Sequence, residues 1–421
     1  MKSLHTYHFS FVFSAFVVTV MALPQHAVSQ VYGCTDSAAT NYNPAATANN
    51  GSCIYNAVEY IPPVKVDRLS DTLIETSGLQ MAGNFLWSFN DGGGAAAIYR
   101  VDSITGRILQ TVYLKGASNV DWEDIAFYNG YFYIGDFGNN ATGARTDLKI
   151  YRFPLSAIPA NFKNNPVVYV PASKISTIKF TYANQPQPPQ KSSPNNTQFD
   201  CEAMLIDSGR IHLFTKNWVE QNTTHYVIKG ISAGTYKAQP VETLATGYLV
   251  TGADKSPYQK LVVLLGYQVS GTGRHFMHLL YGYTGTRYFS GNKRKIDLPD
   301  VLTMGQAEGI CFNGDAYGYI SNERFERTVG PIHLDVPPRV HYFNITPYVT
   351  GIKATYVFTG NGDWELAGNW VNSQPPVATP GSNTQVIIDP LPGGQCILHT
   401  PFTIAAGCEL LVKPGKHFVI H

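Results

Sequence analysis

Residues 121–140, DWEDIAFYNGYFYIGDFGNN, place three acidic residues at the mouth of an alternating run of apolar and aromatic residues. The alternation is typical of β-strands, whose successive side chains point to opposite faces of a sheet. Asp121, Glu123 and Asp124 would repel one another unless a cation, hydrogen-bond donors or open water compensates their charge. Whether other parts of the chain repeat this arrangement therefore decides the interpretation.

The arrangement is repeated. Acid-led segments recur as ETSGL at Glu75, DCEAM at Glu202, AEGIC at Glu308 and, more weakly, TGADKS at Asp254. Each precedes a second alternating strand, such as NFLWSFND or RIHLFTKNW, and then a third, such as AIYRVD or KIYRFP. Short antiparallel strands repeated at a roughly constant period of about 45–65 residues predict a β-propeller.

The predicted fold class is therefore all-β, with a propeller of five or six blades. Five units can be aligned, and the segment VKVDRLSDTL (64–73) is expected to supply the missing outer strand of the last one. A sixth, degenerate unit would have to lie within residues 156–196, which include the Pro-rich loop NQPQPPQKSSPNN.

Composition agrees with a β-rich exported protein. Charged residues make up 14% of the 421 residues and aromatic residues 13%, with 38 Gly and 26 Pro. Thirty basic against 29 acidic side chains create no global field that would attract nucleic acid or an anionic membrane. We therefore do not expect the protein to bind nucleic acid.

Four segments are expected along the chain. Residues 1–29 have a positive start, an apolar core and small residues before Gln30, which predicts a cleaved signal peptide. A small Cys-bounded module (30–59), the propeller (60–350) and a β-rich C-terminal module (351–421) follow. We expect a secreted or cell-surface protein, with the periplasm as the alternative and no membrane-spanning segment after cleavage.

The six cysteines of an exported chain predict disulfides. Cys34 and Cys53 would close the N-terminal module, which has too few apolar residues for a core. Cys396 and Cys408 are expected to join neighbouring strands of the C-terminal module. Cys201 and Cys311 lie on inner strands of different units, and we expect two buried thiols.

The repeated acids are expected to converge on one mouth of the propeller channel. As candidate metal ligands they are Glu75, Glu123, Glu202, Glu308 and Asp254. A hard cation such as Ca²⁺ would neutralise them, because it prefers several oxygen ligands. The alternative is that they accept hydrogen bonds from backbone N–H groups of the neighbouring blade.

Polar residues near the ends of the second strands form a candidate ligand-binding layer: Asp91, Asp136, Asn139, Lys216, Glu323 and Arg324.

Two resemblances add to this interpretation. The segment GCTDSAATNYNPAATANNGSC (33–53) resembles a short Cys-bounded module of secreted Bacteroidota proteins. The segments ETSGL, LWSFNDGGG, DWEDIA, YIGDFGNN, AEGICF and GYISNE resemble exported propellers called esterase-like or phytase-like, and periplasmic propellers regulated with quorum sensing. That resemblance implies a channel metal, calcium, and in some relatives phosphoester hydrolysis. It marks Glu75, Asp91, Glu123, Asp136, Glu202, Glu308 and Glu323.

Three functions remain open at this stage. The favoured one is binding of a polar small molecule or glycan at a calcium-supported channel mouth. The second is a metal-dependent phosphoesterase, although the chain lacks an evident Lys and Arg cluster for several phosphates. The third is a structural surface adhesin. The sequence nominates no catalytic residue, because no arranged nucleophile and base can be identified.

Overall fold

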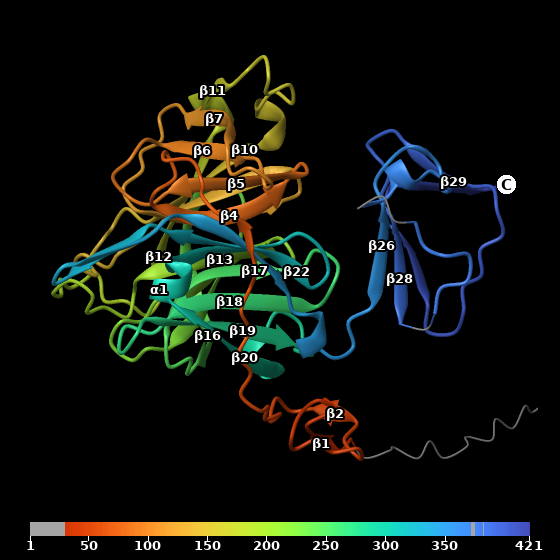
Figure 1. Cartoon of the computed structure of the whole chain (residues 1–421), viewed down its shortest axis with the longest axis horizontal. Coiled ribbons are helices and arrows are strands. Elements are labelled where there is room, and N and C mark those ends of the chain that lie inside the picture. Colours follow the sequence, from red (N-terminus) through yellow and green to blue (C-terminus); the bar gives the residue numbers. More distant parts are fainter. Residues whose placement is uncertain (1–29, 372–374, 382) are drawn as a thin grey trace, which may run out of the picture.

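The computed structural model of the protein describes residues 30–371, 375–381 and 383–421, which form an almost wholly β structure (Figure 1). The predicted signal peptide, residues 1–29, lies outside the described residues. Within the described ranges the α-helical content is a single turn, α1 (Val301–Met304). No helix in those ranges has the length and apolar character of a membrane-spanning segment. The predicted all-β class is confirmed.

The middle of the chain repeats a unit of four strands. The first two units consist of β4 (Thr76–Ala82), β5 (Phe85–Asn90), β6 (Ala97–Val101) and β7 (Ile108–Leu114), then β8 (Trp122–Tyr128), β9 (Tyr131–Asp136), β10 (Lys149–Pro154) and β12 (Ser176–Tyr182). The next two consist of β13 (Cys201–Asp207), β14 (Arg210–Thr215), β15 (Thr223–Ile228) and β16 (Gly234–Leu244), then β17 (Leu249–Lys255), β18 (Leu261–Tyr267), β19 (Arg274–Tyr281) and β20 (Asn292–Asp300).

The last unit combines strands from both ends of this region. It consists of β21 (Gln306–Phe312), β22 (Tyr317–Glu323), β25 (Arg339–Asn344) and β3 (Val64–Val66). The N-terminal strand β3 pairs antiparallel with β25, so the segment beginning at Val64 closes the last sheet as predicted. Cys311 on β21 and Cys201 on β13 are buried free thiols, as expected.

The first strands of the units form the centre of a β-propeller. β4, β8, β13, β17 and β21 contact one another in cyclic order, and β21 meets β4. Each is followed by antiparallel neighbours that lead outward, and Figure 1 shows the order β4, β5, β6, β7, β11 from the centre to the rim. Residues 156–196 supply two strands to existing sheets, β11 (Val167–Val170) beside β7 and β12 beside β10 and β16.

Aromatic side chains fill the space between adjacent sheets. Trp87 of β5 packs edge-on against Phe132 of β9 with ring centroids 5.0 Å apart, and Phe89 packs against Trp122 at 5.5 Å. All four rings are fully buried. Edge-to-face packing of such large apolar groups stabilises the contact between blades and keeps the inner strands in place.

The N-terminal module is closed by the predicted Cys34–Cys53 disulfide. Its strands β1 (Tyr32–Gly33) and β2 (Ala48–Asn49) pair in parallel. Asp36 fastens the module to the propeller by accepting hydrogen bonds from Tyr55 (2.7 Å), Tyr281 (2.6 Å) and Thr350 (2.8 Å). Asp36 therefore has a structural role.

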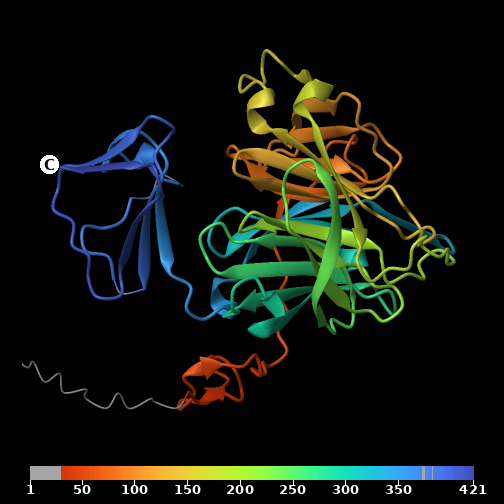
Figure 2. The same ribbon diagram turned by 180° about the vertical axis from the view of Figure 1, so that it is seen from behind.

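The C-terminal module is a coil of parallel strands that alternate between two sheets, seen beside the propeller in Figure 2. One sheet contains β26 (Ala354–Phe358), β28 (Thr384–Ile388) and β30 (Glu409–Val412), and the other β27 (Gly362–Asp363), β29 (Gln395–Leu398) and β31 (His417–Ile420). The predicted Cys396–Cys408 disulfide is wrong, because both thiols are buried and free. Cys396 lies on β29 and Cys408 precedes β30, so the two belong to different sheets.

Candidate metal centre at the channel mouth

β-Bulges present the repeated acids at the start of the inner strands. Glu123 on β8, Glu202 on β13 and Glu308 on β21 each occupy a position where the pairing with the next strand shifts register. Such a bulge re-aims one side chain out of the regular alternation. The same shift falls at Ser77 on β4 and at Thr251 on β17. Three glutamates and two hydroxyl residues therefore hold equivalent positions around the channel mouth.

Two acids that the sequence assigned to this ring do not hold a bulge position. Glu75 precedes β4 and is exposed, although its charge acts on Asp91 and Glu323 at the mouth. Asp254 lies near the far end of β17, because that strand begins at Leu249 and Thr251 takes the equivalent position. The expectation that Asp254 is a metal ligand at this mouth is therefore wrong. The sequence alignment placed Asp254 at the start of the inner strand, but the fourth unit has no acid at that position.

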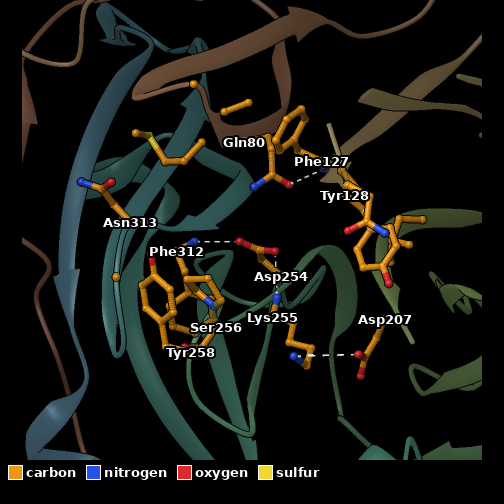
Figure 3. Close-up of a pocket in the computed structure, with 18 of the residues that line it drawn as sticks. Gln80, Phe127, Tyr128, Asp207, Asp254, Lys255, Ser256, Tyr258, Phe312 and Asn313 are labelled. Carbon is orange, nitrogen blue, oxygen red and sulfur yellow. Dashed lines mark hydrogen bonds and ion pairs between the residues drawn. The ribbon is translucent and has the colours of Figure 1, made fainter. Parts of the chain in front are cut away.

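Asp254 instead joins backbone groups at the opposite end of the channel. Figure 3 shows its carboxylate between the backbone N–H groups of Phe312 and Lys255, each at 2.8 Å. Asp124 behaves in the same way, accepting from the N–H groups of Ile125 (2.8 Å) and Met204 (2.6 Å). Both acids link neighbouring inner strands, which is the structural alternative that the sequence left open.

Three carboxylates converge at the other mouth. Oxygens of Asp91, which follows β5, and of Asp121 and Glu123 at the start of β8 all lie within 4.8 Å of one another. Glu123 is 5% exposed, and its carboxylate has no hydrogen-bond or ion-pair partner among the described residues. Burial, then the charges of Asp91 and Glu202, raise the pKa of Glu123 well above its usual range.

The cluster depends on close approach of the backbone. A Cβ added at Gly138 would collide with Glu123 Oε1 and Asp121 Oδ2, and one at Gly92 would lie 2.7 Å from Asp121 Oδ1. Burial, together with the charge of Asp91, raises the pKa of Asp121 to about 7. Arg145, 4.0 Å from Asp121 Oδ2, and the N–H group of Gly92, which donates to Asp91, offset part of the repulsion among these acids, whereas the carboxylate of Glu123 has no such partner among the described residues.

The geometry of this cluster suits Ca²⁺. Calcium takes oxygen ligands at about 2.3–2.6 Å, so two ligands on opposite sides of one ion are at most about 5 Å apart. The oxygens of Asp91, Asp121 and Glu123 meet that limit. They would supply three of the six to eight ligands the ion prefers, with water and carbonyl groups completing the shell.

A second group of charges surrounds Lys216 beside the cluster. Its ammonium lies 2.5 Å from Glu202 Oε2 and 5.0 Å from the ring centres of both Trp218 and Tyr267. Burial lowers the pKa of Lys216, but Glu202 and other neighbouring groups outweigh it, so the net shift is upward. Lys216 is therefore charged and held by its carboxylate partner.

Glu308 and Glu323 complete the mouth. Gln306 donates to Glu308 Oε1 at 2.6 Å and to Glu323 Oε2 at 3.2 Å. Burial raises the pKa of Glu308 to about 7 and that of Glu323 well above its usual range. A pocket of about 400 Å³, lined in part by Tyr267 and Gln306, adjoins this group.

Two residues of the predicted ligand-binding layer, Asp136 and Asn139, are occupied by internal contacts. Asp136 is buried and pairs with Arg145 (2.8 Å) and Lys149 (3.0 Å). Asn139 is buried; it accepts from Arg145 N of its own loop at 2.9 Å and donates to Phe199 O of the segment before β13 at 3.1 Å. Both expectations are wrong because each side chain is fully buried and engaged by neighbouring groups, and Asp136 also accepts from Asp121 N at 3.2 Å.

Arg324 also lies outside the site. It points to the hairpin of β23 (Phe325–Val329) and β24 (Ile332–Val336), where it pairs with Asp335 at 2.9 Å. Asp91, Lys216 and Glu323 do lie at the mouth.

Asp121 and Asp200 were not among the metal ligands expected from the sequence. Each stands two residues before a bulge glutamate, in the repeated pattern D-x-E of Asp121/Glu123 and Asp200/Glu202. Asp200 is fully buried and accepts from Trp218 Nε1 at 2.7 Å and from Asn139 N at 2.6 Å. The D-x-E spacing was thus a signal in the sequence for two residues of the mouth.

Comparison with known proteins identifies no close relative. No family model matches the chain, and no curated protein matches it. Among solved structures, an exo-β-1,3-galactanase from Phanerochaete chrysosporium is 11% identical, with a TM-score of 0.39 over 68% of this chain and 64% of that chain. A GH43 β-1,3-galactosidase is 10% identical, with a TM-score of 0.36 over 68% of this chain and 60% of that chain. The chain thus spans less than two thirds of either protein, and scores this low assign neither family nor activity.

Proposed function

We propose that the protein is a five-bladed β-propeller that binds Ca²⁺ through Asp91, Asp121 and Glu123 and presents it to a polar ligand at the channel mouth. The observation that carries the proposal is the buried, unpartnered carboxylate of Glu123 within 4.8 Å of two further acids. The count of five blades is supported by the cyclic contacts of five inner strands.

The ligand class follows from what surrounds the cation site. A bound calcium ion would offer its remaining coordination positions to hydroxyl, carboxylate or phosphate oxygens. Lys216 adds a positive charge, and Trp218 and Tyr267 add aromatic surface beside it. The adjoining pocket of about 400 Å³ lies within the usual size of small-ligand sites. We propose a glycan or another hydroxyl-rich small molecule.

A phosphoesterase is the second candidate, and one observation favours it. Arg145 Nη1 lies 4.0 Å from Asp121 Oδ2, so a cationic group stands beside the proposed metal ligands. A metal that polarises a phosphate and activates water could use such a group to hold the substrate. Arg145 is also paired with Asp136, which leaves it less available to a phosphate.

The adhesin alternative requires acids that are satisfied by backbone donors. Asp124 and Asp254 fit that description, whereas Glu123 does not.

The predicted signal peptide and the Cys34–Cys53 disulfide support export of the protein, because disulfides persist in oxidising compartments. We therefore propose a secreted or cell-surface protein.

The test is calorimetric titration of Ca²⁺ into the chelator-treated protein. We expect one site that is lost or at least tenfold weaker in Asp121→Asn, and unchanged in the neighbouring control Asp124→Asn. Absence of binding to the wild-type protein would refute the metal site. With calcium bound, oligosaccharides and a chromogenic phosphomonoester are then offered separately; calcium-dependent glycan binding supports the first candidate, and calcium-dependent turnover the second.

A further inference from the structure

A second polar site lies away from the channel mouth, around Arg100 of β6. Arg100 is 3% exposed, opposite Trp87 on the neighbouring strand. Its Nη1 donates to Ala160 O at 3.3 Å, and its buried Nε has no hydrogen-bond partner. In the described part of the chain no carboxylate forms an ion pair with Arg100, and burial alone lowers its pKa. A buried cation therefore lacks a counter-charge.

Aromatic rings compensate this charge only in part. The guanidinium carbon lies 4.6 Å from the ring centre of Phe85, 4.8 Å from that of Trp87 and 5.4 Å from that of Phe162. Cation–π contacts stabilise a cation only modestly, whereas the burial of an unpaired ion costs considerably more free energy. A purely structural role for Arg100 would explain neither the uncompensated cost of burying its charge nor the unpaired Nε.

Arg100 lines a pocket of about 580 Å³ between the first two sheets. The β4–β5 turn at Gly83 and the β8–β9 turn at Gly130 border it, so it lies at the opposite end of the inner strands from the acidic mouth. Phe85, Tyr131 and Leu155 are among the apolar side chains that line it. Arg100 is the one charged side chain among the described residues that line it.

We propose that this pocket binds an amphipathic monocarboxylate, with its carboxylate on the Arg100 guanidinium and its apolar body against Phe85, Tyr131 and Leu155. The planar guanidinium presents N–H donors in a fork that matches a carboxylate. One buried positive charge calls for one negative charge, and an apolar wall disfavours a dianion such as a phosphomonoester. The proposal is independent of the calcium site.

The test uses octanoate as the probe and the full chain as the protein. We expect calorimetric titration to show octanoate binding that is at least tenfold tighter than binding of octanol, because a charge-assisted hydrogen bond contributes about 1.5–3 kcal/mol. Arg100→Met keeps the apolar stem and removes the charge. It should weaken octanoate at least tenfold and leave octanol unchanged.

A second variant protects the test from a folding defect in Arg100→Met. Ala160 is exposed at the rim, so Ala160→Trp fills the entrance without disturbing the core. It should weaken octanoate and octanol together while the melting temperature stays unchanged. Octanoate that does not bind, that binds no tighter than octanol, or that binds Ala160→Trp as well as wild type would overturn the proposal.

Discussion

Replacement of Glu123 by glutamine tests the central electrostatic argument, because it removes one charge from the cluster at nearly constant shape. Glu123 lies within 4.8 Å of Asp91 and Asp121. At that distance two ionised carboxylates repel by about 3.5 kcal/mol at an effective dielectric constant near 20, and by about 0.9 kcal/mol in bulk water. The variant should therefore relieve a strain of about 1–3.5 kcal/mol for each ionised neighbour when calcium is absent.

The sign of the effect depends on pH. The folded-state pKa of Glu123 is raised above its unfolded value, so between these two values the native state binds more protons than the unfolded state. The stability of calcium-free wild type then falls as pH rises, by up to about 1.4 kcal/mol per pH unit for this group. Glutamine does not titrate. The variant should match wild type most closely at pH 5 and exceed it increasingly towards pH 8.

Calcium should reverse that order. An ion at about 100 times its Kd stabilises the native state by about 2.7 kcal/mol, a gain that the variant loses as its affinity falls. The assay is urea unfolding of the chelator-treated protein from pH 5 to 8, with and without calcium. Asp124→Asn is the matched control: it should be less stable throughout and keep the full calcium gain, since Asp124 holds backbone N–H groups. A Glu123→Gln protein that is less stable than wild type without calcium, and gains as much from calcium, would refute the reasoning.

Three further outcomes are expected. Asp136→Asn should lower the free energy of unfolding by about 1.5–3 kcal/mol in urea titrations, because it removes the charge of a buried carboxylate that pairs with Arg145 and Lys149, although both cations keep Asp147; a loss below about 1 kcal/mol would mean that these ion pairs contribute little. Gly138→Ala should weaken calcium at least tenfold in calorimetry, because the added methyl group displaces Glu123 Oε1; unchanged affinity would place the ion elsewhere. Alkylation of the denatured, unreduced protein, followed by mass spectrometry, should detect four labelled thiols: Cys201, Cys311, Cys396 and Cys408. Labelling of only two would mean that Cys396 and Cys408 form a disulfide.

Local patterns in the sequence were enough to predict the propeller and much of its acidic mouth. Alternation and repetition act over a few residues, so they identified the inner strands, the closing segment from Val64 and the acids Glu123, Glu202 and Glu308. The close spacing of Cys34 and Cys53 likewise predicted a bridge that joins residues near in the chain. These features depend on short-range chemistry that a sequence displays directly.

Only the tertiary structure decided which acids meet. The bulge of β17 falls at Thr251, so Thr251 takes the position at the mouth, and Asp254 lies three residues further along the strand, near its other end. Asp136 pairs with Arg145 and Lys149. Cys396 lies on β29 of one sheet and Cys408 directly precedes β30 of the other, although the two are close in sequence. The pairing of Asp91 with Asp121 and Glu123 likewise joins two blades. Register and contact between blades are set by packing across the whole ring, and a one-residue difference in register reverses the direction in which a side chain points.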